Sequence, residues 1–397
     1  METNNNMKNL FSDSFALQCK TETDFMKAVH EMEKATSWIA GQETNSIKVV
    51  PVSGPIEAEQ VSKRTNTSME AAYETCDGEA GTQLLIEYGE KEYLIRTCAI
   101  RSLRESAKIS GSALNRLGNY KLSEVLNLCF SVAKGSSLLL KRADKVSAVL
   151  SDNMGGYKIM PMPELLNVTR SRLEGDFGVP VYESGFVDHE ITTVTWALPD
   201  RQSQIMDAYQ KSIDLSQRRI YAAKFMPAVT FTSSDIGNCA ATLYPHFITD
   251  TGGTFTLFNP IRVFHKRGAQ EGVELFRQRS EELFSVFMTM NKNLKELSSL
   301  IIENPQNAFI GLCKKVEIPK KFGSPALEEF MQLIDDGSGA GRCTALDLYI
   351  AIGESVAAAK RLGCVGHQVS TLIENTSKIL HQNIEDFDVA GVVAWSD

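Results

Sequence analysis

The sequence predicts an α+β protein with a central antiparallel sheet, N-terminal helices and a C-terminal helical block. The middle of the 397-residue chain carries short runs rich in Val, Ile, Thr and aromatic residues, which are typical of strands. Turns containing glycine separate several of these runs and favour hairpins. From residue 271 onward, apolar residues recur at helical spacing. We expect an N-terminal helix and irregular connector over 1–82, an α+β core over 83–270 and a helical region over 271–397.

The composition is that of an ordinary soluble globular protein. Hydrophobic residues make up 43% of the chain and charged residues 23%, with a net charge of −8. This balance argues against a protein that holds nucleic acid through a uniformly basic surface. A local basic groove on an acidic body remains compatible with it.

The scattered cysteines, together with the lack of a signal peptide or a long apolar segment, predict that the protein lies in a reducing cytoplasm. The eight cysteines include no CxxC pair, so a structural zinc site is not expected. The N-terminal residues lack the basic and apolar regions of a signal peptide. No run reaches the roughly 18 apolar residues of a membrane span, so we expect no membrane association.

The N-terminal region divides into a helix and a connector. Residues 21–40 carry apolar side chains at helical spacing, and Thr21 with Asp24 fits a capping pattern. Residues 41–81 are polar and poor in aromatic side chains. The sequence therefore predicts a weakly structured connector or irregular insertion there.

The next segment is predicted to form a hairpin and three helices. Residues 83–97 hold two apolar runs around a glycine turn, which indicates a hairpin. Short helices are expected over 99–107 and 112–117, and an amphipathic helix over 121–134.

The clearest hairpin lies within residues 138–166. An apolar run is followed by a short basic gap, and residues 145–150 then alternate as a strand does. The polar, glycine-containing residues 151–156 form the following turn, and residues 157–160 continue beyond it.

More strands are expected further along the chain. Residues 181–198 are rich in Val, Ile, Thr and aromatics and predict an antiparallel pair with a break near Asp188. Residues 202–219 have helical periodicity. Further strands are expected at 224–232, 240–248 and 254–265, each of which contains a proline typical of edges or strand ends.

The C-terminal region is predicted to be helical. One long amphipathic helix is expected over 271–302, ending before Pro305. Shorter helices are expected over 325–334, 344–362 and 368–382.

A glycine-rich run at 337–344 allows two interpretations. Backbone N–H groups at such a helix start can bind phosphate. A P-loop requires GxxxxGK followed by Ser or Thr, whereas Asp336, Arg342 and Cys343 occupy three of its key positions. We favour a linker with Thr344 as the helix cap, and a phosphate-binding loop is the alternative.

No catalytic or metal-binding motif is recognisable. The six histidines include no HExxH motif and no pair at helical ligand spacing. A GxSxG nucleophile motif is also missing. We therefore expect no metal, no cofactor and no catalytic residue. Enzymatic activity stays open, and the missing motifs favour a protein that is not an enzyme.

Basic residues gather in four clusters near aromatic residues. Single-strand binding proteins stack bases on aromatic rings and hold the phosphates with cations. In this chain, Phe264, Tyr221 and Phe322 could provide such rings beside the basic clusters. The alternative for each cluster is solvated charge at the ends of strands and helices. The cluster at 262–267 is the best candidate because it closes a strand. The candidate nucleic-acid contacts are Lys141, Arg142, Lys145, Arg218, Arg219, Arg262, His265, Lys266, Arg267, Lys314 and Lys315.

Several short motifs occur in an order that resembles a known family. They are the strand 146–152 ending in Leu-Ser-Asp with Tyr157 after the turn, the helix start 163–166, the paired helices 99–117, the Ser-Asp-Ile-Gly turn 234–237 and the helix 344–354. Together they resemble the phage/plasmid-like proteins of the family called domain of unknown function 932. The resemblance runs from about residue 83 to the end of the chain. It implies a gene carried on a phage, prophage or plasmid and a bacterial cytoplasm, but no catalytic residues.

Two functions follow as hypotheses. The first is a mobile-element protein that binds single-stranded DNA or RNA in replication or recombination, as an annealing-type homo-oligomer. The basic clusters and the family resemblance favour it. The alternative is a non-enzymatic host-takeover or counter-defence protein that binds a host protein or a small ligand. The acidic composition and the missing catalytic motifs favour that alternative.

Overall fold

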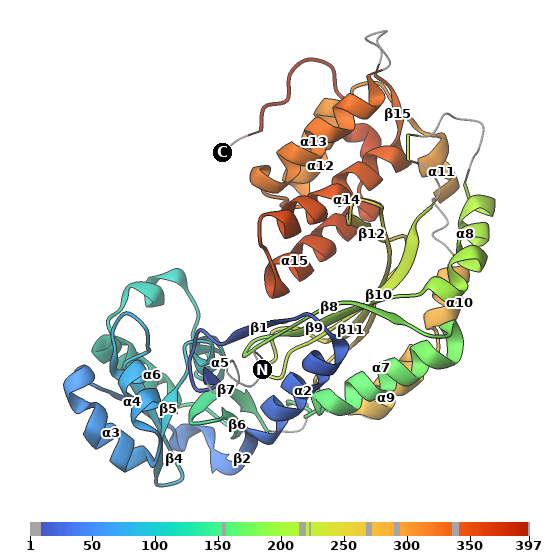
Figure 1. The fold of residues 1–397 in the computed structure, drawn as a ribbon. Coiled ribbons are helices and arrows are strands. Elements are labelled where there is room, and N and C mark those ends of the chain that lie inside the picture. The colour runs from blue at the N-terminus through green and yellow to red at the C-terminus, as the bar shows by residue number, and fades with distance from the viewer. Residues whose placement is uncertain are drawn as a thin grey trace.

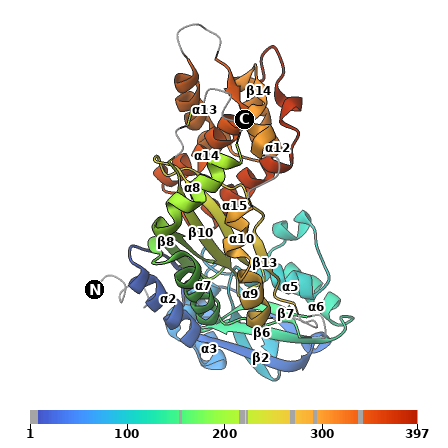
Figure 2. The ribbon, with the colours of Figure 1, turned by 90° about the vertical axis from the view of Figure 1, so that its right-hand side faces the viewer.

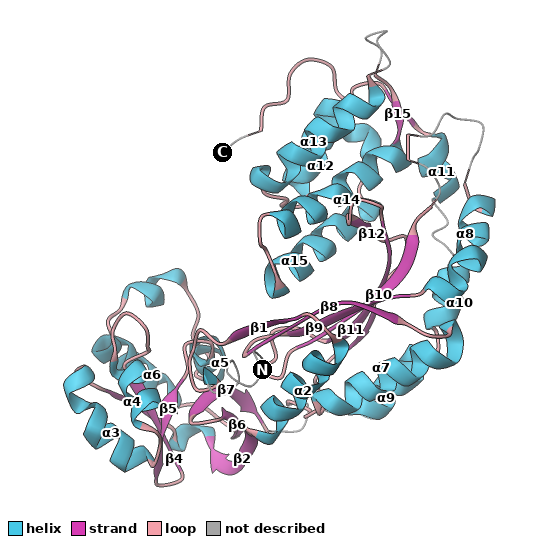
Figure 3. Cartoon of the chain, viewed as in Figure 1, coloured by secondary structure: helices cyan, strands magenta, loops and turns pink. Residues whose placement is uncertain are grey.

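The computed structural model describes residues 9–152, 156–213, 220–221, 224–266, 272–289, 294–335 and 341–395. The α+β class is confirmed, with strands in two main groups, one in the middle of the molecule and one at its end, and helices beside both (Figures 1 and 3). Within these residues the strands form a seven-stranded sheet, a six-stranded sheet and a two-stranded ribbon. We call the two large sheets sheet A and sheet B.

Sheet A is antiparallel throughout and strongly curved (Figure 1). Its strands follow the order β1-β8-β9-β10-β11-β12, and β13 pairs with the other end of β11. The predicted strand 254–265 is divided in two, because Pro260 interrupts it. The strands are β1 (Ala16–Cys19), β8 (Val181–Asp188), β9 (Thr192–Ala197), β10 (Met226–Ser233), β11 (Ala241–Ile248), β12 (Thr254–Phe255) and β13 (Ile261–Val263).

Sheet B is mixed, because β5 and β7 run parallel while its other pairs are antiparallel. The predicted hairpin 83–97 forms β4–β5 at its centre. Within the predicted stretch 138–166 the hairpin is β6–β7, which turns at residues 143–144 within the basic gap, whereas residues 157–160 beyond the predicted turn form no strand and Tyr157 makes an isolated bridge to Lys266. The strand order of sheet B is β2 (Thr36–Glu43), β6 (Ser136–Arg142), β7 (Lys145–Ser151), β5 (Lys91–Ile95), β4 (Leu84–Tyr88) and β3 (Lys48–Pro51). Strands from 36–51 therefore share a sheet with strands from 84–151, across the boundary expected at residue 82.

The expectation of an irregular connector over 41–81 is wrong. The region contains β3 and two helices, α3 (Ala58–Thr65) and α4 (Met69–Cys76). Small buried residues such as Val61 and Ala72 pack against Leu85 and Leu94 of sheet B. The residues that this region contributes to the cluster are mainly alanine and valine, so no large apolar or aromatic side chain marks them in the sequence.

Three helical segments connect β5 to β6 close to their predicted positions. They are α5 (Ala99–Ser106), the 3₁₀ turn η4 (Ser112–Arg116) and α6 (Asn119–Phe130). Leu103, Leu126 and Phe130 are buried against sheet B. The other 3₁₀ turns are η2 (Thr44–Ser46), η3 (Pro55–Glu57), η5 (Pro199–Arg201), η6 (Lys378–His381) and η7 (Ile384–Phe387).

Helices cover the apolar face of sheet A (Figure 2). Val194, Trp196, Phe231 and Phe247 lie on this face and are buried. The covering helices are α2 (Glu22–Lys34), α7 (Met162–Phe177), α8 (Gln202–Lys211), α9 (Gly272–Ser280) and α10 (Leu283–Met288). Thr21 caps α2 as predicted, since its Oγ1 accepts a hydrogen bond from the Asp24 N–H.

The single helix expected over 271–302 is wrong. The span contains α9, α10, α11 (Leu294–Ser299) and the short strand β14 (Ile301–Ile302). These segments pack on different neighbours: α9 on α7 and β13, α10 on α8 and β11, and α11 on α14 and β15 (Cys343–Thr344). A straight helix could not reach all of these partners, so tertiary packing overrides the continuous periodicity.

The C-terminal region forms the predicted helical block. Its helices are α12 (Pro305–Lys315), α13 (Lys320–Ile334), α14 (Ala345–Arg361) and α15 (Gly366–Ser377). Thr344 caps α14 as expected, accepting from the Asp347 N–H at 3.1 Å, and Arg342 is ion-paired with Glu303. Residues 336–340 of the glycine run lie outside the described residues.

Candidate nucleic-acid interface

Several of the sequence motifs meet where sheet B joins sheet A. Four segments line a depression of about 360 Å³: the end of β7, the turn at 156–157, the β10–β11 turn and residues 264–266. Tyr157 connects them, because its backbone bridges to Lys266 and its hydroxyl donates to the Asp235 carbonyl at 2.9 Å. The Leu-Ser-Asp strand, its following Tyr and the Ser-Asp-Ile-Gly turn are therefore neighbours in space.

An aromatic stack forms the floor beside this depression. The Tyr157 ring stacks on His265 at 5.0 Å and on Trp38 at 5.6 Å between ring centroids. Burial raises the pKa of the Tyr157 phenol well above its usual value. Burial also lowers the pKa of His265, against the opposing effect of Asp235. His265 is therefore a buried, neutral part of the floor, and the prediction that it contacts phosphate is not supported by its position.

Arg142 and Lys145 are buried in ion pairs and cannot contact a nucleic acid in this structure. Arg142 Nη2 lies 2.6 Å from Asp235 Oδ2. Lys145 Nζ lies 2.8 Å from Asp13 Oδ1 and 2.5 Å from a Glu74 carboxylate oxygen. The basic residues at the turn between β6 and β7 therefore lie inside the protein. Lys141, which precedes Arg142 in β6, is half-buried.

These cations belong to a larger buried polar cluster. Arg96 is fully buried and donates to the carbonyls of Phe11 and Ser12, at 3.1 and 2.8 Å. Desolvation lowers the pKa of Arg96 to about 10 against the attraction of Asp13. His189 Nε2 lies 2.8 Å from Arg96 Nη1. The cluster ties the N-terminal segment to both sheets, which is a structural role.

The cluster at 262–266 is partly exposed. The Phe264 side chain is 63% exposed, and the Lys266 ammonium lies 5.9 Å from its ring centroid. Arg262 forms an ion pair with Glu374 at 3.2 Å and lies over the Tyr244 ring. Phe264 and Lys266 are thus the predicted contacts that reach the depression with an exposed surface.

The remaining predicted contacts lie elsewhere. Lys314 and Lys315 are exposed at the C-terminal end of α12, in the helical block (Figure 1). Cations there suit the negative end of the helix dipole. Arg218, Arg219 and Arg267 lie outside the described residues.

A second depression adjoins the first. It measures about 200 Å³ and shares Glu105, Leu150 and Ser151 with the larger one. Its other lining includes the exposed Lys108 and Lys134. We call the two depressions together the junction groove.

Among the cations at this groove, Lys266 was a predicted contact and Lys134 begins a predicted basic cluster, whereas Lys108 and Arg101 were not predicted. Lys108 follows α5 in a left-handed conformation with φ of 58°, and Lys134 precedes Gly135. Arg101 donates to Glu105 at 3.0 Å and to Asn238 at 3.5 Å. Lys108 and Arg101 are single cations, so no run of basic residues marks them in the sequence, whereas Lys134 begins the basic cluster that ends at Lys145.

The thiol of Cys239 also lines the larger depression of the groove. In the described part of the chain, no group of three or more His, Cys, Asp or Glu side chains could hold a metal ion. The eight cysteines are free thiols. Each described helix is too short or too polar to span a bilayer.

Comparisons with protein-family models, with curated proteins and with solved structures find no match to this chain.

Proposed function

We propose that this protein binds single-stranded nucleic acid along the junction groove. The observation that carries the proposal is the exposed Phe264–Lys266 pair at one end of a groove that has Lys108 and Lys134 at the other. An exposed aromatic ring can stack on an unpaired base, while flanking ammonium groups hold the phosphates on either side. The resemblance to phage/plasmid-like proteins supports a role of this kind in replication or recombination on a mobile element.

The charge of the groove supports binding of a strand even though the whole chain is acidic. Lys266, Lys108 and Lys134 bring positive charge to it, while Arg101 and Glu105 neutralise each other in an ion pair. A local basic track on an acidic body restricts the strand to one path. It also keeps the number of neutralised phosphates small, so the affinity is expected to depend moderately on salt.

Fluorescence anisotropy of a labelled single-stranded oligonucleotide at low salt tests the proposal. We expect wild-type protein to bind, and Phe264→Ala to weaken binding at least about fivefold, since stacking contributes roughly 1–3 kcal/mol per base. Tyr73→Ala is the matched control, because Tyr73 is an exposed aromatic residue on α4 outside the groove. It should leave the affinity unchanged.

Two results would contradict the proposal. One is that folded wild-type protein does not bind the oligonucleotide at low salt, which would turn attention to a host protein as partner. The other is that Phe264→Ala binds as tightly as wild type.

A further inference from the structure

Sheet A has a second, polar face that the proposed function does not use. Residues opposite each other on neighbouring strands point to the same side of a sheet. Thr195 pairs with Thr230, and Thr193 with Thr232, in the register of β9 and β10. Their hydroxyls lie 2.7 and 3.0 Å apart. A row of hydroxyl groups therefore faces away from the apolar core.

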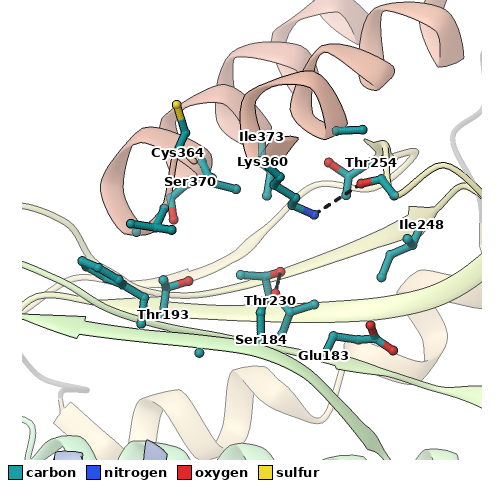
Figure 4. A pocket seen from close by; sticks show the side chains of 18 of the residues that line it. Glu183, Ser184, Thr193, Thr230, Ile248, Thr254, Lys360, Cys364, Ser370 and Ile373 are labelled. Carbon is teal, nitrogen blue, oxygen red and sulfur yellow. Dashed lines mark hydrogen bonds between the residues drawn. The ribbon is translucent and has the colours of Figure 1, made fainter. Parts of the chain in front are cut away.

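This hydroxyl face forms the floor of a cavity of about 480 Å³ (Figure 4). The C-terminal end of α14 and the helix α15 form its roof, and the β11–β12 turn closes one side. The volume lies within the roughly 300–1,000 Å³ typical of pockets for small molecules. We call it the roof cavity.

One cation points from the roof into this cavity. Lys360, in the last turn of α14, donates to the Gly252 carbonyl at 3.3 Å (Figure 4). Among the described residues no carboxylate lies within ion-pairing distance of its ammonium, so its other N–H groups are available to a ligand. Desolvation lowers the pKa of Lys360, and Glu183 and Glu354 oppose this shift.

The floor supplies acceptors. His246 lines the cavity, and its Nδ1 lies 2.9 Å from the Tyr244 carbonyl. A carbonyl oxygen accepts, so Nδ1 carries the proton and Nε2 is left as an acceptor. Burial lowers the pKa of His246 to about 4, which keeps the ring neutral at pH 7. Glu183, on β8, presents a carboxylate from the floor (Figure 4).

Polar groups at the β11–β12 turn lack partners within the described chain. Thr254 lines the cavity and is buried, and its Oγ1 has no hydrogen-bond partner. Nearby, Glu354 accepts from Thr251 through one carboxylate oxygen, while its other oxygen is unpartnered. Thr254 therefore adds a buried polar side chain to the wall of the cavity, and Glu354 lies behind it.

We propose that the roof cavity binds a small phosphorylated sugar, with its phosphate at Lys360 and its hydroxyls on Thr230, His246 and Glu183. A lysine ammonium suits phosphate as a point charge. Threonine hydroxyls, a neutral imidazole and a carboxylate suit sugar hydroxyls, which both donate and accept. The same chemistry could come from a free sugar phosphate or from a nucleotide.

Isothermal titration calorimetry on the full chain tests this proposal with ribose 5-phosphate, adenosine 5′-monophosphate and unphosphorylated ribose. We expect at least one phosphorylated probe to bind and ribose to bind much more weakly. Binding of ribose 5-phosphate identifies the sugar phosphate as sufficient, and binding of the nucleotide alone assigns the base a part as well. If neither phosphorylated probe binds at about millimolar concentration, or if ribose binds equally well, the proposal is overturned.

Two variants localise the binding. Lys360→Met should weaken it about tenfold or more, since a hydrogen bond to a charged group contributes roughly 1.5–3 kcal/mol. Ser370→Leu, on the half-buried face of α15, should block the cavity without touching Lys360. Lys121→Met, on the exposed surface of α6, is the control. Unchanged binding in both cavity variants would overturn the proposal.

The same variants separate this cavity from the junction groove. Lys360→Met should bind the labelled oligonucleotide as wild type does, because Lys360 lies outside the groove. A parallel loss of oligonucleotide binding in this variant would contradict the independence of the two sites.

Discussion

Single buried charges decide how the N-terminal segment joins the rest of the protein. Lys145 and Arg96 are fully buried, and both contact Asp13. Lys145 was expected to be a surface cation because it lies next to a short basic gap between two strands. Its burial depends on a segment more than a hundred residues earlier in the chain, which folds over the hairpin. Local pattern cannot show such a contact.

Lys145→Met should destabilise the protein by about 3 kcal/mol, because it leaves the carboxylates of Asp13 and Glu74 buried without their shared cation. Urea unfolding measures this effect. Lys141→Met, on the same hairpin but half-buried, is the control and should cost less than about 1 kcal/mol. Equal stability of the two variants would contradict the structural role of the cluster.

His189 should make stability fall as the solution becomes acidic. Desolvation, followed by Arg96 and Arg142, lowers its pKa from 6.5 to about 2. Between about pH 2 and 6.5, His189 is therefore protonated in the unfolded chain but neutral in the folded protein. The contribution of His189 to the free energy of unfolding rises with pH across this window and is constant above it.

Between pH 7 and pH 5 this histidine alone should remove about 2 kcal/mol of stability. Urea unfolding at both pH values should show a smaller change in His189→Gln than in wild type, whatever the absolute stability of the variant. An identical change in both proteins would show that His189 does not titrate in this way.

At the scale of elements, hairpins and capped helices were predictable, and the packing of short helices was not. The alternation at residues 145–150 predicted the strand β7, and the break near Asp188 predicted the β8–β9 turn. In that turn, Asp188 Oδ1 accepts hydrogen bonds from the N–H groups of Glu190 and Ile191, both at 2.7 Å. The region 41–81 was missed because small residues build its core. The predicted long helix is divided because its parts pack on different neighbours.

The cap of α14 is an element-scale device with a measurable effect. The Thr344 hydroxyl accepts from the Asp347 N–H and donates to the Asp347 carboxylate at 2.7 Å. Thr344→Ala should lower the free energy of unfolding by about 1–2 kcal/mol. Thr344→Ser keeps the hydroxyl and should restore most of that loss. A serine variant as unstable as the alanine variant would show that lost packing, not the cap, is responsible.

At the scale of the whole molecule, the candidate site exists only because two sheets meet. The strand motif 146–152 and the turn motif 234–237 were each visible in the sequence. Their convergence around Tyr157 was not, since the turns that carry them are about 80 residues apart. The groove cation Lys108 was missed for the same reason, because it is isolated in sequence and joins the other groove cations only in the fold, whereas Lys134 already belonged to a basic cluster in the sequence.

The salt dependence of oligonucleotide binding tests the groove most directly. For single strands, the logarithm of the affinity falls with the logarithm of salt concentration by about 0.7 for each neutralised phosphate. The three groove lysines Lys108, Lys134 and Lys266 predict a slope of about −2 for wild type, because Arg101 is already paired with Glu105. Replacing Lys108, Lys134 and Lys266 together by glutamine should make this slope shallower by about 2. The exposed pair Lys314 and Lys315, replaced likewise, should leave it unchanged. A slope that stays at the wild-type value in the triple variant, or that falls equally in the control, would contradict binding along the junction groove.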